Sequence, residues 1–209
     1  MTAVPTCPRC FGKLTEPGAV PTAWWCVVHG EVPPHRSHQP GPAGVELIRG
    51  STVPVWLPWP LPAGWLVTGF AEAGDRASVV AVSGPSLSSG PADLLIVCEE
   101  PGVGLGSAYA GLPGPDPGDI VARTPITKID ANGHSIPLWV VRADVPADRA
   151  VYVGEAAGRW LWAIAWPAEA GNLITLMQLA LADLRDLEWD VPFGAFSPRL
   201  TGEGAAETG

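Results

Sequence analysis

Four residues near the start of the chain have the spacing of a metal site. Cys7 and Cys10 are separated by two residues, fifteen residues follow, and then Cys26 and His29 are again separated by two. In each pair a tight turn points both ligands to one side, and an intervening hairpin brings the two pairs together as a tetrahedron. The pattern predicts a small zinc ribbon.

The predicted zinc has a structural role. Three cysteines and one histidine form a closed shell of protein ligands, whereas a catalytic zinc keeps one position open. A redox dithiol formed by Cys7 and Cys10 is the main alternative, but it lacks a strand–helix context and leaves the second pair unexplained. His35 and His38 are alternatives to His29 as the fourth ligand. The two-residue spacing from Cys26 favours His29.

Charge and hydropathy narrow the function classes. The 209-residue chain has a formal net charge of −9, and residues 1–44 carry +1 of it, so the remainder is strongly acidic. An acidic body repels phosphate, which argues against nucleic-acid binding. No apolar run approaches the roughly 18 residues of a membrane span, and residues 1–10 do not resemble a signal peptide. We expect a cytoplasmic protein without a membrane partner, in which cysteine clusters hold metal.

Composition divides the chain into four parts. Residues 1–33 form the predicted ribbon, and residues 34–44 form a linker rich in proline and glycine. Residues 45–200 form the main domain, and residues 201–209 form a small, acidic tail that we expect to be disordered.

Apolar runs bounded by turn residues predict several strands in the main domain. They cover residues 64–70, 77–83 and 93–100. Asn132-Gly133 and Ala157-Gly158 each mark a hairpin turn between two further pairs of strands. The glycine-rich loop (residues 101–119) contains so much glycine and proline that no regular element is expected there.

The fold class expected from these patterns is α+β. A mainly antiparallel sheet would carry one C-terminal amphipathic helix on its face. That helix is predicted over residues 175–188, where Thr175 and Gln178 have the spacing of a capping box. Its apolar stripe consists of Leu173, Met177, Ala180, Leu181, Leu184 and Leu187.

Two groups of residues are candidates for a functional site in the main domain. Trp160, Trp162 and Trp166 share one face of a predicted strand, where they form either buried core, the favoured interpretation, or an apolar groove for a ligand or partner. Glu99 and Glu100 end a strand beside the glycine-rich loop and suggest acid–base chemistry. However, neighbouring residues in a strand point to opposite faces, which weakens that hypothesis.

The chain resembles an uncharacterised actinobacterial family, a domain of unknown function with an N-terminal Cys3His knuckle pair. The resemblance rests on "VPVWLPWPLPAGWLVTG", "EEPGVGLGSAYAG", "GEAAGRWLWAIAWP" and "FGAFSPRL". Members are sometimes labelled phosphotransacetylase, but the sequence contains no recognisable acyl-phosphate or coenzyme A site. The resemblance therefore implies no particular activity.

These observations predict a non-enzymatic binding or regulatory protein. It would carry a structural Zn²⁺ and a tryptophan-rich domain that engages a protein partner or a small ligand. The first alternative is an enzyme with its site at the glycine-rich loop, using Glu99 or Glu100. The second is nucleic-acid binding through the ribbon.

Overall fold

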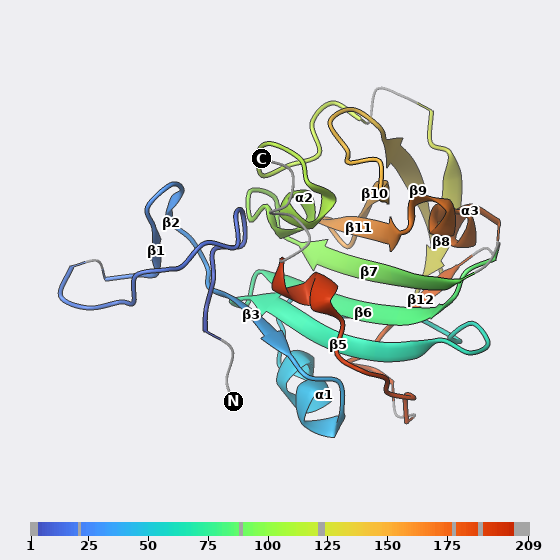
Figure 1. Ribbon diagram of the computed structural model, residues 1–209, viewed down its shortest axis with the longest axis horizontal. Coiled ribbons are helices and arrows are strands. Elements are labelled where there is room, and N and C mark those ends of the chain that lie inside the picture. Colours follow the sequence, from blue (N-terminus) through green and yellow to red (C-terminus); the bar gives the residue numbers. More distant parts are fainter. Residues whose placement is uncertain are drawn as a thin grey trace.

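Two β-sheets make up most of this protein, as the computed structural model in Figure 1 shows. The structure describes residues 4–20, 22–87, 90–120, 124–176, 179–187 and 190–202. Within these residues one sheet has two strands and the other has ten, and the helices are few and short. The architecture is therefore mainly β, with less helix than the α+β class predicted from the sequence.

The small sheet pairs β1 (Trp25–Cys26) with β2 (Gly30–Glu31). The strands of the large sheet are, in chain order, β3 (His35–His38), β4 (Trp56–Pro58), β5 (Leu66–Ala73), β6 (Ala77–Pro85), β7 (Pro91–Glu99), β8 (Thr127–Ala131), β9 (His134–Val141), β10 (Ala150–Ala156), β11 (Arg159–Trp166) and β12 (Ala180–Asp183). The α-helices are α1 (Pro42–Arg49), α2 (Leu105–Ala110) and α3 (Asn172–Leu176), and η1 (Ala168–Gly171) and η2 (Pro198–Thr201) are 3₁₀ turns.

The strand order of the large sheet is β3-β5-β6-β7-β11-β10-β9-β8-β12-β4. Neighbouring strands are antiparallel, except that β12 runs parallel to β8. The last strand in this order, β4, also packs against β6 and β7 in the middle of the sheet. The sheet therefore curves over itself, and the small sheet with its loops projects from one side of it (Figure 1).

Both faces of the middle strands of the large sheet are buried, as β11 illustrates. Leu161, Ala163 and Ala165 point into the larger core, which the curved sheet encloses. Trp162, Ile164 and Trp166 point into a second core on the opposite face. This alternation is the one predicted from the sequence. The second core also contains Leu105 and Tyr109 of α2 and Leu200 of η2, so short segments cover that face.

The two hairpins predicted from turn residues are confirmed. β8 and β9 meet at Asn132-Gly133, and β10 and β11 meet at Ala157-Gly158. All four turn residues have positive φ angles between 50° and 80°. This conformation is the one that a type I′ turn requires at both central positions.

The long C-terminal helix predicted from the sequence is wrong. Helix α3 ends at Leu176, and Ala180–Asp183 form strand β12, while Met177 and Gln178 lie outside the described residues. β12 pairs with β4 on one side and with β8 on the other. These backbone pairings with distant segments outweigh the local helical spacing of the leucines, because tertiary contacts override propensity.

Two further expectations need correction. The predicted linker, residues 34–44, contains β3 and the first residues of α1, so the chain joins the large sheet where a spacer was expected. The glycine-rich loop contains α2, because the Glu99 carboxylate accepts hydrogen bonds from the backbone N–H groups of Leu105 and Gly106 and so supplies the start of a helix. Of the predicted disordered tail, residues 203–209 lie outside the described residues.

Candidate metal centre

Two tight turns hold the four predicted ligands. In the first, the N–H of Phe11 donates to the Cys7 carbonyl at 2.8 Å, and the N–H of Cys7 donates to the Gly12 carbonyl at 2.8 Å. The second turn joins β1 to β2, where Cys26 pairs with Gly30. Gly30 has a φ of +73°, which favours glycine and lets the chain reverse directly after His29. Each turn therefore presents two ligands on the same side.

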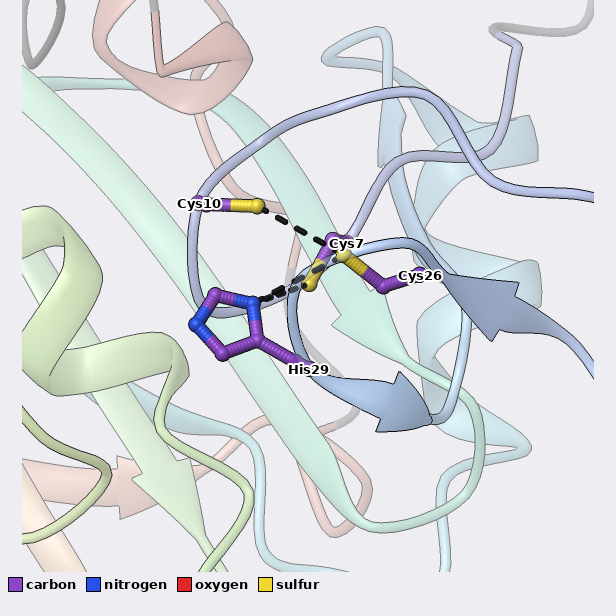
Figure 2. A group of neighbouring side chains, drawn as sticks. All are labelled: Cys7, Cys10, Cys26 and His29. Atoms are coloured by element: carbon purple, nitrogen blue, oxygen red, sulfur yellow. Dashed lines mark hydrogen bonds between the residues drawn. The ribbon is translucent and has the colours of Figure 1, made fainter.

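The four ligand atoms converge on one point. Figure 2 shows the sulfur atoms of Cys7, Cys10 and Cys26 together with the His29 ring, and one ligand atom from each residue lies within 4.8 Å of all the others. Cys10 Sγ is 3.8 Å from Cys26 Sγ. His29 Nδ1 is 3.5 Å from Cys7 Sγ and 3.7 Å from Cys26 Sγ. In the described part of the chain this is the only group of three or more metal-ligating side chains found this close together.

These separations fit a tetrahedral zinc ion. With Zn–S bonds of about 2.3 Å and Zn–N bonds of about 2.0–2.1 Å, tetrahedral geometry separates two sulfurs by roughly 3.8 Å and a sulfur from a nitrogen by roughly 3.6 Å. The sulfur–sulfur and sulfur–nitrogen distances given above agree with both values. His29 would bind through Nδ1, and the donor set suits Zn²⁺ with no position left for substrate.

The thiols of the cluster differ in their readiness to ionise. Burial raises the pKa of Cys7 to about 12. Burial acts in the same direction on Cys26, but the backbone N–H groups of Val28 and His29 and the His29 ring favour the thiolate and lower its pKa to about 6. Cys26 therefore offers a ready thiolate, whereas a metal must displace the proton of Cys7.

The apolar core around the cluster is very small. It consists of Cys7, Leu14, Cys26 and Val32, with Trp24 packed against it. A core of this size cannot by itself offset the conformational entropy of the surrounding loops. The fold around the cluster is therefore expected to depend on the bound metal.

The alternative ligands His35 and His38 lie elsewhere. His35 is buried, with Nδ1 2.8 Å from the Thr6 hydroxyl and Nε2 2.9 Å from the Tyr109 hydroxyl. Because the Tyr109 hydroxyl donates to the Leu200 carbonyl, it accepts the Nε2 proton of His35. Burial lowers the pKa of His35 to about 4, so the ring stays neutral. His38 faces Glu72 at 3.5 Å.

The tryptophans of β11 do not form an open groove. Trp162 is fully buried and Trp166 is 4 % exposed, and both belong to the second core. Trp160 is half-buried, and its indole N–H donates to Asp116 of the glycine-rich loop at 3.0 Å. The core interpretation of these side chains therefore fits their burial, and a ligand could reach Trp162 only by displacing the segments that cover it.

The two glutamates point in opposite directions, as neighbouring strand residues should. Glu99 is completely buried, and burial raises its pKa to about 7, although the hydrogen bonds from Leu105 and Gly106 act in the opposite direction. Glu100 lies at the surface, where it pairs with Arg76 at 2.8 Å and Arg159 at 3.6 Å. The carboxylates therefore do not converge on one site.

The sequence alone does not indicate the residues that dock the metal-binding turns onto the rest of the protein. Arg9, between the first two ligands, donates to the carbonyls of Gly102 and Val103 in the glycine-rich loop at 2.5 and 3.2 Å. Phe11 packs against His35 and Tyr109, with ring centroids 5.3 and 5.0 Å apart. In the sequence, Arg9 and Phe11 are distinguished only by their position next to the cysteines. That position does not predict which distant residues they contact.

Comparison with known proteins identifies one family for this chain. One family, described as a family of unknown function (DUF6758), has a model that matches residues 1–200. No curated protein and no solved structure matches the chain. None of the helices in the described residues is long and apolar enough to cross a membrane.

Proposed function

The chain belongs to this family of unknown function, and we propose that it is a zinc-binding, non-enzymatic module that engages a protein partner. Cys7, Cys10, Cys26 and His29 would hold a structural Zn²⁺ in a small ribbon. The observation that carries the zinc assignment is the agreement between the ligand separations of the cluster and those of tetrahedral zinc. When bound, the metal would neutralise the thiolates and cross-link the two turns.

The partner surface that we propose lies on the second metal-binding turn. Trp25, Val27 and Val28 are 45 %, 86 % and 73 % exposed and follow one another around Cys26. Large apolar side chains held rigidly at a projecting turn are typical of protein contacts, in which aromatic residues are enriched. The buried tryptophans of β11 do not offer such a surface, so the proposed binding site moves from the main domain to this turn.

The alternatives receive less support. An enzyme site at the glycine-rich loop needed convergent carboxylates, but Glu99 is engaged by α2 and Glu100 by two arginines. Nucleic-acid binding through the ribbon lacks a basic surface, because residues 1–44 carry a net charge of only +1.

Zinc content tests the first half of the proposal. The purified protein should contain one zinc per chain by elemental analysis, and Cys26→Ala and His29→Ala should each lose most of it. Cys98→Ala and His38→Ala are matched controls and should retain the metal, because Cys98 is buried in the sheet and His38 lies beside Glu72. Full zinc content in His29→Ala with loss in His38→Ala would contradict the ligand assignment.

A comparison of co-purifying proteins tests the second half. The wild type and a Val27→Ser, Val28→Ser double variant would be isolated from the native source under identical conditions. A specific partner should be lost from the double variant and retained by Leu47→Ser, which changes an exposed apolar residue on α1. A partner retained equally by all three proteins would place its binding site elsewhere.

A further inference from the structure

Arg9 carries hydrogen bonds from the metal-binding turns to the glycine-rich loop, beside the ring contact of Phe11 with Tyr109. Arg9 lies between the ligands Cys7 and Cys10, and its own N–H points at Cys7 Sγ at 3.5 Å. From this position the guanidinium reaches across to the carbonyls of Gly102 and Val103. A charged donor on neutral carbonyls makes a strong hydrogen bond.

The Gly102 peptide is held from both sides. Its carbonyl accepts from Arg9, while its N–H donates to Asp116 Oδ1 at 2.9 Å. The same Asp116 oxygen accepts the indole N–H of Trp160 on β11 at 3.0 Å. A continuous chain of hydrogen bonds therefore runs from the first metal-binding turn through the glycine-rich loop to the large sheet.

The fit of the loop around Arg9 is close. Gly104 has a φ of +86°, and a Cβ atom there would lie 3.0 Å from Arg9 Cγ and 3.0 Å from Pro115 Cα. A larger residue would push the loop away from the turn. Glycine at this position thus permits the approach that lets Arg9 reach the two carbonyls.

The loop also builds one wall of a cavity. Residues 112–113 and 116–120 line this space of about 280 Å³ together with residues 141–144, and its volume is just below the usual range of small-molecule sites. Asp116, which holds Gly102, lines this space. Any change in the position of the loop therefore changes the cavity.

We infer that binding of the metal orders the glycine-rich loop, with Arg9 as the connection. The inference rests on the proposed zinc binding. The metal fixes Cys7 and Cys10 on either side of Arg9, and so fixes the backbone from which the guanidinium extends. Without the metal, the small core around the cluster cannot keep this turn folded. The carbonyls of Gly102 and Val103 then lose their hydrogen bonds from Arg9. Metal loading and the shape of the cavity wall are then coupled.

Hydrogen exchange measured by mass spectrometry tests this coupling. Peptides that cover residues 101–111 should exchange at least roughly fivefold faster in chelated protein than in zinc-loaded protein, in the usual range of allosteric coupling. Arg9→Ala should show the faster exchange while it retains zinc. Arg36→Ala is the matched control, since Arg36 is a basic residue in the same part of the chain that stacks on Trp24.

Zinc affinity provides a second, reciprocal measurement. Coupling is symmetric, so loosening the loop must weaken metal binding by the factor by which the metal tightens the loop. Asp116→Ala removes the oxygen that accepts from Gly102 and Trp160, and should lower zinc affinity roughly fivefold in a competition titration with a chelator. Asp119→Ala, at a neighbouring exposed carboxylate, should leave the affinity unchanged.

The possible failures are distinguishable. If the wild type binds no zinc, the proposed function fails. If it binds zinc, but chelation or Arg9→Ala leaves exchange of residues 101–111 unchanged, the coupling fails alone. An Asp116→Ala variant with wild-type zinc affinity would also overturn the coupling.

Discussion

The buried carboxyl of Glu99 should make the stability of the protein fall as the pH rises. Burial raises its pKa from the ordinary value of 4.5 to about 7 in the folded protein. A group whose pKa is raised by folding binds its proton more tightly in the native state. The resulting stability is therefore present in full below pH 4.5 and is lost progressively up to about pH 7.

The size of the effect follows from these two pKa values. One pKa unit corresponds to about 1.4 kcal/mol, so the full loss is about 3 kcal/mol, of which about 2.5 kcal/mol falls between pH 5 and pH 8. Leu105 and Gly106 donate to different oxygens of Glu99, so Glu99→Gln keeps one of the two acceptors, and it cannot ionise. The loss of the other acceptor lowers the free energy of unfolding by an amount that does not change with pH. The variant should therefore gain about 2.5 kcal/mol relative to the wild type over that range.

Urea denaturation of both proteins, side by side at pH 5, 6, 7 and 8, measures this difference. Titrations of the metal ligands affect both proteins alike and cancel in the comparison. Glu100→Gln, at the adjacent surface position, is the matched control and should show no comparable trend. A free-energy difference between Glu99→Gln and the wild type that stays constant from pH 5 to pH 8 would refute the assignment of Glu99 as a buried titrating group.

Three further predictions concern packing, ion pairing and the metal. Gly106→Ala should destabilise the protein by about 1–3 kcal/mol, because the new Cβ overlaps the Trp162 indole, whereas Gly18→Ala should be nearly neutral in the same denaturation assay. Asp183→Ala removes the acceptor for the Val55 N–H and the partner of Arg185, and should lower the free energy of unfolding by about 3 kcal/mol. Chelation should lower the melting temperature measured by calorimetry, and added Zn²⁺ should restore it.

Features set by local chemistry could be predicted from the sequence. The hairpin at Asn132-Gly133 follows from residues that accept positive φ. The convergence of Cys26 and His29 likewise follows from their spacing within one turn. In both cases the partners lie close together in the chain, so the pattern alone is sufficient.

Features that depend on distant partners could not be predicted. Leu181 and Asp183 lie in a strand because segments more than forty residues away pair with their backbone. The helical spacing of the leucines contains no information about those partners. The role of Arg9 depends on carbonyls 93 and 94 residues away. The sequence suggests that Glu99 is available for acid–base chemistry. Only the structure shows that its carboxylate accepts a hydrogen bond from the first turn of α2.

The order of strands in the large sheet has a consequence for synthesis on the ribosome. β4 is synthesised early, but among the described residues it pairs only with β12, so the backbone hydrogen bonds of residues 56–58 form only after residues 181–183 have been synthesised. Phe11 in turn packs against Gly202. The nascent chain therefore holds an open sheet with exposed apolar faces until almost all of it has been made, and contacts of such long range form slowly. Its early segments are those most in need of protection from aggregation during translation.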